Sequence, residues 1–340
     1  MEFILYLLYL YVLVYSLYLL ILSIRNLKDR PFFIERKYSR YDDSKASFAV
    51  IIYSHNHKEC LEELVEELKM QDYPLADFKV YANTADYIPF LLRLAKENEV
   101  KYLFPLTDLE IDVINAKREL FEQEGIVVCI SSKETLKVAR NKYSLYKAFK
   151  DDANVPSVPT YTLEDDLSRL NYPCVAKPRD GRSSEGLCYL KNENQLNEIK
   201  HISSYIFQEK IAGSVCTVDY VREPLSGASF CVPREELLRT KNGAGTTVRI
   251  FRDETLENLV KYIGQKLNIS GVVNMEFIKN STGYYLIDIN PRFSAGIAFS
   301  CQKGYDFVNA HLACFMNNAL PKPISYSEGI AIKYFVEWVK

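Results

Sequence analysis

Apolar runs alternate with amphipathic stretches between Ser47 and Ile130. Short apolar runs predict buried strands, and stretches with apolar residues on one face predict helices. The predicted strands are Phe48–Tyr53, Phe78–Ala82, Tyr102–Leu106 and Ile126–Ile130, and the predicted helices are Glu59–Met70, Tyr87–Asn98 and Leu109–Glu124. This alternation across short loops predicts a parallel sheet covered on both faces, a Rossmann-like domain over residues 47–131. Ser54–His57 stands where a glycine-rich dinucleotide motif would follow the first strand, so dinucleotide binding is not supported.

The pattern changes from Ser131 onward. Two helices, Lys133–Ala139 and Lys142–Phe149, precede a series of short strands separated by glycine-containing turns. The predicted strands are Cys174–Lys177, Gly186–Leu190, Tyr205–Gln208, Thr217–Val221, Val272–Ile278 and Tyr284–Ile289, with helices at Glu193–Lys200 and Leu256–Leu267. This order favours an α+β architecture with antiparallel sheets. The fold class expected for the whole chain is therefore α/β plus α+β, with two further lobes at 132–206 and 207–340.

The N-terminus carries 22 consecutive uncharged residues, Phe3–Ile24. As a helix this run would be about 33 Å long, enough to cross a hydrocarbon core of about 30 Å. Basic residues follow it within 25–46, and the positive-inside rule then places the remaining chain in the cytoplasm. We expect a single transmembrane anchor at 1–24, a basic linker at 25–46 and a location at the cytoplasmic membrane. The alternative is a buried core helix.

Composition limits the remaining choices. The chain has 340 residues, of which 48% are hydrophobic and 25% charged, with a net charge of -2, so it is neither disordered nor a general binder of nucleic acid. Its 8 cysteines include no C-x-x-C pair, which argues against a zinc site or a disulfide scaffold and favours reduced, mostly buried thiols.

Two segments contain candidate chemistry. Lys177 ends an apolar strand, and a Gly- and Ser-rich turn bounded by Gly181 and Gly186 follows it, an arrangement that can bind a polyphosphate. It is not a P-loop, and an ordinary hairpin is the alternative. Asp288 and Asn290 alternate along a later strand, so their side chains share one face and suit Mg²⁺.

The candidate metal-binding residues extend to a neighbouring apolar strand and to the turn that follows. Glu276 lies among hydrophobic residues and needs a partner, which a shared metal would provide, while Asn290-Pro291 turns the chain and places Arg292 beside the same cation. The alternative is a pair of edge-strand carboxylates that form ion pairs.

The order of these motifs resembles the ATP-grasp superfamily, in particular ligases like the carbamoyl phosphate synthase large subunit, from about residue 84 onward. The segments that carry the resemblance are Pro105–Glu110, Ala139–Tyr143, Val175–Pro178 with its loop, Phe207–Ile211, and the strand that contains Asp288. The resemblance implies a pre-ATP domain at 47–131, ATP-grasp lobe A at 132–206 and lobe B with the metal site at 207–340.

The resemblance also implies roles for individual residues. The residues implied to bind phosphate are Lys142, Lys177, Gly181, Ser183, Ser184 and Gly186. The residues implied to form the hinge that recognises adenine are Glu209, Lys210 and Ile211. The residues implied to bind the metal are Glu276, Asp288 and Asn290, and Arg292 is implied to contact the phosphate that is transferred. Lys177 and Arg292 are the catalytic candidates.

Two positions depart from the family pattern. Asp288 stands where a glutamate is more usual, and Val215 stands where many relatives have a ribose-binding glutamate. Arg234 and Arg239 resemble basic residues on the acceptor or phosphate side, with a solvated charged stretch as the alternative.

The implied activity is that of a ligase that uses ATP and Mg²⁺, with Mn²⁺ as an alternative metal. It phosphorylates a carboxylate, and an amine or similar nucleophile then displaces phosphate, in cell-surface polysaccharide or small-metabolite biosynthesis. Partners would be small molecules, with a homodimer as an option and no nucleic acid. A nucleotide-binding fusion protein without turnover is the alternative.

Residues 1–82 resemble the start of a membrane-anchored family 2 glycosyltransferase, through the anchor, the strand Phe48–Tyr53 and Met70–Pro74. No Asp-x-Asp metal motif occurs in the chain, so we reject sugar transfer as an activity and keep sugar recognition as a third option. His55 and His57 lack an evident third metal ligand and are expected to be surface histidines.

Overall fold

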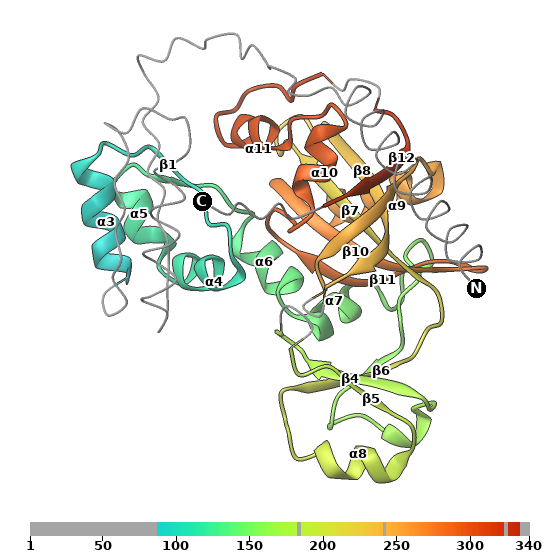
Figure 1. The fold of residues 1–340 in the computed structure, drawn as a ribbon. Helices are drawn as coiled ribbons and strands as arrows, with labels where there is room; N and C mark the ends of the chain where they lie inside the picture. The colour runs from blue at the N-terminus through green and yellow to red at the C-terminus, as the bar shows by residue number, and fades with distance from the viewer. Residues whose placement is uncertain (1–86, 182–184, 241–242, 323–325, 334–340) are drawn as a thin grey trace, which may run out of the picture. The chain divides into compact units, whose positions relative to one another are not determined.

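The computed structural model describes residues 87–181, 185–240, 243–322 and 326–333 (Figure 1). All of these lie in one compact unit, Asn83–Lys340, and Met1–Ala82 forms the other. The predicted anchor, basic linker, first two strands and first helix therefore fall outside the described residues, as do His55 and His57. Among the helices that the structure describes, none is long and apolar enough to span a bilayer.

The first described segment confirms a parallel strand pair with helices around it. Strands β1 and β2 pair in parallel, and the elements are α3 (Tyr87–Glu97), β1 (Tyr102–Leu103), α4 (Asp108–Ala116), α5 (Arg118–Gln123) and β2 (Val127–Val128). The single helix predicted at Leu109–Glu124 is in fact two helices that meet at Lys117. A capping box fixes the start of α4, because Thr107 accepts from the Glu110 amide and the Glu110 carboxylate accepts from the Thr107 amide.

Two capped helices lead into the second half of the chain. Helix α6 (Lys133–Ala139) and helix α7 (Lys142–Phe149) have the predicted bounds. Ser132 caps α6 and Asn141 caps α7, each through a side-chain oxygen that accepts hydrogen bonds from amides of the first turn. The cap at Asn141 places Lys142 at the first position of α7.

A four-stranded sheet, ordered β3-β6-β4-β5, follows. Its strands and helices are β3 (Thr160–Tyr161), the 3₁₀ helix η2 (Leu167–Arg169), β4 (Cys174–Pro178), β5 (Cys188–Leu190), α8 (Glu193–Ile199) and β6 (Tyr205–Glu209). All its pairings are antiparallel, as expected. Because β6 belongs wholly to this sheet, the next sheet begins at Ser214, a few residues after the predicted boundary at 206/207.

A six-stranded antiparallel sheet, ordered β11-β10-β7-β8-β9-β12, forms the largest part. Its elements are β7 (Ser214–Arg222), β8 (Ser229–Arg239), β9 (Gly245–Ile250), α9 (Glu254–Lys266), β10 (Gly271–Asn280), β11 (Gly283–Asn290), α10 (Ile297–Gln302), α11 (Phe307–Phe315) and β12 (Gly329–Ile332). The sequence prediction missed β8, β9, β12, α10 and α11. Pro233 disfavours a strand prediction for β8, but it lies just before the ladder to β9 begins at Arg234.

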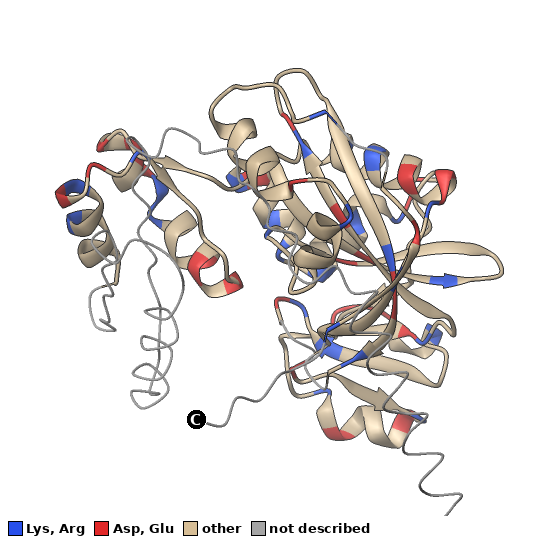
Figure 2. Cartoon of the chain, turned by 45° about the horizontal axis from the view of Figure 1, so that its top comes forward, with Lys and Arg blue, Asp and Glu red and all other residues tan. Residues whose placement is uncertain are grey.

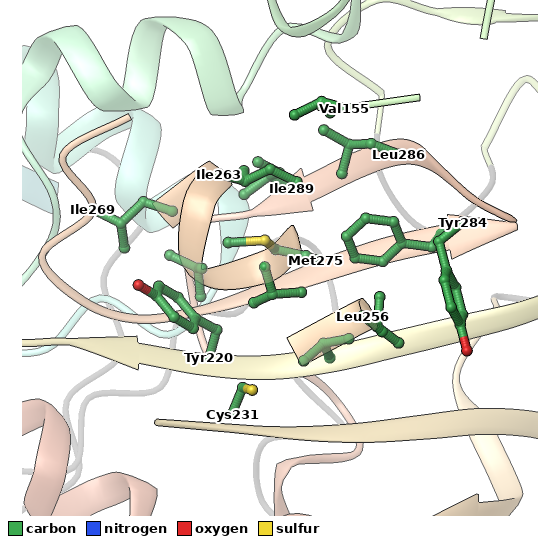
Figure 3. Packing of buried hydrophobic residues seen from close by; sticks show 14 of the residues in the cluster. Val155, Tyr220, Cys231, Leu256, Ile263, Ile269, Met275, Tyr284, Leu286 and Ile289 are labelled. Carbon is green, nitrogen blue, oxygen red and sulfur yellow. The ribbon is translucent and has the colours of Figure 1, made fainter. Parts of the chain in front are cut away.

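Helices cover both faces of this sheet. On one face, Val218 and Tyr220 of β7 pack with α7 and α9 in the main hydrophobic cluster (Figure 3). On the other face, Val221 packs against α10 and α11. Strand residues alternate between faces, so Thr217 and Asp219 point to the same face as Val221, where the site lies. Burial also raises the pKa values of several core thiols, those of Cys129, Cys231 and Cys314 to about 12, so these cysteines stay protonated.

Candidate active site

Strand register aligns polar residues in a row across the six-stranded sheet. Asp288 faces Glu276, Glu276 faces Thr217, and Thr217 faces Arg234 on successive antiparallel strands. Directly paired residues point to the same face of a sheet, so the row forms one polar surface. A β-bulge beside Glu276 shifts the register of β11, which sends Leu286 into the core while Asp288 stays on the site face.

This surface is the floor of a cavity of about 290 Å³. The walls come from α7, the β4–β5 hairpin, β7 to β11 and the loop after β11. Of the predicted site residues, the cavity gathers Lys142, Lys177, Gly181, Glu276, Asp288, Asn290 and Arg292. Lys and Arg positions and Asp and Glu positions are spread over the described elements (Figure 2), and residues of both charges line this cavity.

Two lysines form the cationic side of the cavity. Lys142 Nζ lies 3.2 Å from Asp288 Oδ2 and donates to the Gly181 carbonyl at 2.8 Å. Burial lowers the pKa of Lys177 to about 8; the nearby Asp288 and Glu276 partly offset this effect, and Lys142 adds to it. The structure thus brings together the two lysines predicted from segments 35 positions apart.

The carboxylates face each other on β10 and β11. Burial, and then repulsion from Asp288, raise the pKa of Glu276, although Arg239 and the two lysines act in the opposite direction. Arg239 Nη2 lies 3.5 Å from Glu276 Oε2, and Asn290 Nδ2 donates to Glu276 Oε1 at 3.2 Å. Asp288 and Asn290 therefore share a face, as predicted.

These three side chains fit a hard divalent cation. Two carboxylates and one amide offer only oxygen ligands to such an ion, and a cation between them would relieve the repulsion that raises the pKa of Glu276. Among the described residues no group of three or more His, Cys, Asp or Glu could hold a metal by itself. Further ligands would have to come from a substrate or from water, which is the usual arrangement for Mg²⁺.

Arg292 is fixed from outside the sheet. Its Nη2 donates to Asp108 Oδ2 at 2.8 Å and to Asn290 Oδ1 at 3.3 Å. Asp108 is only 4% exposed, and its Oδ1 lies 3.2 Å from Arg140 Nη1, while Arg140 also forms a two-point contact with Asp112. The sequence analysis did not assign Asp108, although its place in the resembling segment Pro105–Glu110 was a usable signal.

The phosphate-loop residues lie in several environments. Gly181 lines the cavity, whereas Gly186 takes a φ of +70° and its carbonyl accepts from the Tyr205 hydroxyl at 2.8 Å. A Cβ at Gly186 would come within 2.7 Å of that hydroxyl, so the turn needs glycine. Ser183 and Ser184 fall outside the described residues.

The predicted hinge lies at the end of β6 and does not line the cavity. Glu209 Oε1 accepts from Asn171 Nδ2 at 2.6 Å, and the Lys210 amide donates to the Pro173 carbonyl at 3.3 Å. The Lys210 ammonium lies over the Tyr189 ring at 5.1 Å. Ile211 follows in the connection between the two sheets. The adenine role of these residues stays a prediction.

A second polar network lies in the floor and wall of the cavity and was not predicted as such. Arg234 is 1% exposed, so its alternative interpretation as part of a solvated stretch is wrong. Its Nη1 donates to Asp219 and, at 2.8 Å, to Ser300 Oγ, and its Nη2 donates to Ser294 Oγ at 3.2 Å. Asn274 Nδ2 donates to the other oxygen of Asp219 at 3.3 Å. Buried charges on a strand of mixed charge leave no distinctive sequence signal.

Comparison with known families finds a match over the part of the chain that holds this site. The model described as an ATP-grasp domain matches residues 139–296, a span that contains every predicted site residue. This stretch of the chain is therefore similar to an ATP-grasp domain, and its antiparallel sheets and helices have the mixed α/β architecture expected of that fold. The resemblance of residues 1–82 to a glycosyltransferase stays a prediction.

Two curated proteins, a synthase and a ligase, are similar to parts of the chain. The carbamoyl phosphate synthase large chain of Agathobacter rectalis is 24% identical over 182 residues, 48% of this chain and 17% of that protein. D-alanine–D-alanine ligase of Petrotoga mobilis is 30% identical over 109 residues, 31% of this chain and 36% of that protein. The chain thus spans only a minor part of each relative's length.

Solved structures share the fold. The biotin carboxylase domain dimer of Hydrogenobacter thermophilus 2-oxoglutarate carboxylase, a complex with MgADP, ADP and bicarbonate, has a TM-score of 0.65 and 16% identity. The match covers 81% of this chain and 66% of that one. At this identity the likeness establishes the fold and leaves the reaction to be argued from the site.

Proposed function

We propose that the protein is an ATP- and Mg²⁺-dependent ligase that activates a substrate carboxylate as an acyl phosphate for attack by an amine or a similar nucleophile. The observation that carries this proposal is the gathering of Lys142, Lys177, Glu276, Asp288 and Arg292 around one cavity. Cations for phosphate, carboxylates for a metal and an arginine beside them are the groups that phosphoryl transfer needs. The similarity to an ATP-grasp domain and to these relatives supports the same conclusion.

Each residue contributes by position and charge. Lys142 and Lys177 would bind the ATP phosphates, and Arg292 would stabilise charge on the transferred group. Glu276, Asp288 and Asn290 would hold Mg²⁺, which when bound neutralises phosphate oxygens. Phosphate moves from ATP to the substrate carboxylate, ADP leaves, and the nucleophile then displaces phosphate to form the product. No side chain of the protein needs to act as a covalent nucleophile.

ADP release stimulated by a carboxylate and an amine tests the proposal. We expect release in a screen of carboxylate and amine pairs, and its loss in Lys177→Ala and in Asp288→Ala. Lys261→Ala, on the exposed face of α9, is the matched control and should turn over normally. Unchanged turnover in either site variant would refute the assignment. MgATP binding with no release for any pair would instead support a nucleotide-binding protein without turnover.

The proposal includes a cellular location for the protein. The uncharged run Phe3–Ile24 supports a single-pass anchor that holds the ligase at the cytoplasmic face of the membrane. Cell-surface polysaccharide or small-metabolite biosynthesis would then be the setting, and a dimer is one option for the assembly. Fractionation tests the anchor, because the full chain should stay in the membrane pellet after an alkaline carbonate wash.

A further inference from the structure

One carboxylate in the cavity takes no part in the proposed chemistry. Glu236 lies on β8 two residues after Arg234, so both side chains point to the site face, and its side chain is only 4% exposed. Glu236 Oε1 accepts from Thr217 Oγ1 at 2.6 Å. Within the described part of the chain, Glu236 Oε2 has no hydrogen-bond partner although it is buried. A buried carboxylate oxygen without a partner is costly, and it points to a missing donor.

Nearby cations do not neutralise this carboxylate. Arg234 Nε lies 3.8 Å from Glu236 Oε1, but the charge of Arg234 is already balanced by Asp219, to which it donates directly. Arg239 pairs with Glu276. The two carboxylates Asp219 and Glu236 thus share one arginine, which leaves an excess negative charge at this end of the cavity.

The backbone leaves room for the Glu236 carboxylate. Glu236 Oε2 lies close against Gly245, the first residue of β9, where a Cβ would come within 1.8 Å of this oxygen, so a larger residue at this position would displace the carboxylate. Both Glu236 and Gly245 line the cavity. Glu236 therefore belongs to the wall of the substrate space, and its buried Oε2 lies against Gly245.

The two ends of the cavity have opposite charge. At one end, the carboxylates of Glu276 and Asp288 lie near three cationic side chains, and this end suits the binding of phosphates. The three cations are Lys142, Lys177 and Arg239. Glu236 lies on β8, two strands away from Glu276 on β10, about 10 Å at the usual strand spacing. A small molecule can therefore reach from the phosphate end to Glu236.

From this geometry we propose that Glu236 binds the ammonium group of an amine-bearing substrate. The inference rests on the proposed function and narrows its substrate class to a primary amine or an amino acid. The amine can belong to the incoming nucleophile or to the carboxylate substrate, since the recognising chemistry is the same. An ammonium group would supply the missing donor to Oε2 and balance the excess charge.

Binding by amines and by their deaminated analogues tests the proposal. The full chain, saturated with MgADP, is titrated calorimetrically with β-alanine and propionate, L-glutamate and glutarate, and butylamine and butanol. We expect at least one amine to bind at least tenfold more tightly than its deaminated analogue. Glu236→Gln keeps the shape of the side chain but removes its charge. It should weaken the binding of that amine at least tenfold, while the affinity for MgADP changes less than twofold. Glutamate or β-alanine as the binder indicates an amino acid, and butylamine alone indicates a simple amine nucleophile.

Glu235→Gln is the matched control. Glu235 precedes Glu236 on β8, lies on the opposite face and pairs with Arg249, so its substitution should leave amine binding unchanged. A purely structural role for Glu236, as a counter-ion of Arg234, would lower the melting temperature of Glu236→Gln without a selective loss of amine affinity, and this result overturns the proposal. So does the absence of any amine preference. If amine binding depends on Glu236 but no ATP turnover is found, the proposed ligase activity is wrong and the amine site stands. If ATP turnover is found but Glu236→Gln does not change it, the amine site is wrong and the ligase activity stands.

Discussion

Lys177 should stabilise bound nucleotide but lower the stability of the nucleotide-free protein. Its pKa falls from the usual 10.5 to about 8, chiefly because burial disfavours the charged ammonium. At about 1.4 kcal/mol for each pH unit, the site opposes the charged form by about 3 kcal/mol. Lys177→Met removes that charge and keeps most of the side-chain volume. We therefore expect the nucleotide-free variant to be more stable than the parent protein by up to about 3 kcal/mol.

The sign of the pH dependence follows from the same values. At pH 7 the folded and unfolded proteins both carry the proton on Lys177, so the full penalty applies. Between about 8 and 10.5 the folded protein loses this proton first, the penalty shrinks, and stability rises with pH for this group. The advantage of Lys177→Met should therefore be greatest at pH 7 and fade by pH 10.5.

Calorimetric melting of the nucleotide-free proteins measures this effect. In a chain of this size, roughly 2 °C corresponds to 1 kcal/mol, so the variant should melt about 5 °C higher at pH 7. MgATP binding should be lost in the same variant. Lys261→Met on the exposed face of α9 should change neither quantity. A lower melting temperature for Lys177→Met at pH 7, or a difference from the parent that does not vary with pH, would refute the reasoning.

Two further predictions concern contacts outside the cavity floor. Asp108→Asn should lower kcat about tenfold, about 1.4 kcal/mol of barrier, with unchanged MgATP affinity, because Arg292 loses its charged partner. Steady-state kinetics measure this, and Asp112→Asn, a change at a carboxylate that pairs with Arg140, should stay near the parent rate. His311 has its pKa lowered to about 4 by burial, so the protein should lose up to about 3 kcal/mol of stability as pH falls from 6.5 to 4. Denaturant titration should show a weaker loss in His311→Gln, and an equal loss in both proteins would contradict this prediction.

Local signals in the sequence predict much of the fold. Helices α6 and α7 have their predicted bounds because Ser132 and Asn141 cap them, and a cap depends on only a few adjacent residues. Strand β8 was missed because its apolar residues are interrupted by Pro233, Arg234 and a pair of glutamates. Its burial comes from neighbouring strands, which no short window of sequence contains.

In the candidate site, too, contacts that depend on adjacent residues could be predicted from the sequence, and contacts between distant segments could not. Asp288 and Asn290 share a face because strand side chains alternate, and this could be predicted from two residues alone. The contact between Asp108 and Arg292 joins residues 184 positions apart, and the capping box at the start of α4 gives no hint of it. Long-range polar contacts depend on how whole elements dock, so the sequence pattern cannot specify them.

The buried pair of Arg234 and Asp219 connects stability to the site. A buried ion pair is often no more stable than a hydrophobic pair of similar size, so stability alone does not explain its presence. Arg234 also donates to Ser294 in the loop after β11, and a Cβ at Gly296 would lie 2.9 Å from Arg234 Nη2. The arginine thus holds the chain that follows Arg292 close against the sheet. Because the same guanidinium lies 3.8 Å from Glu236 Oε1, one buried charge lies between the loop that follows Arg292 and the carboxylate proposed to bind the amine.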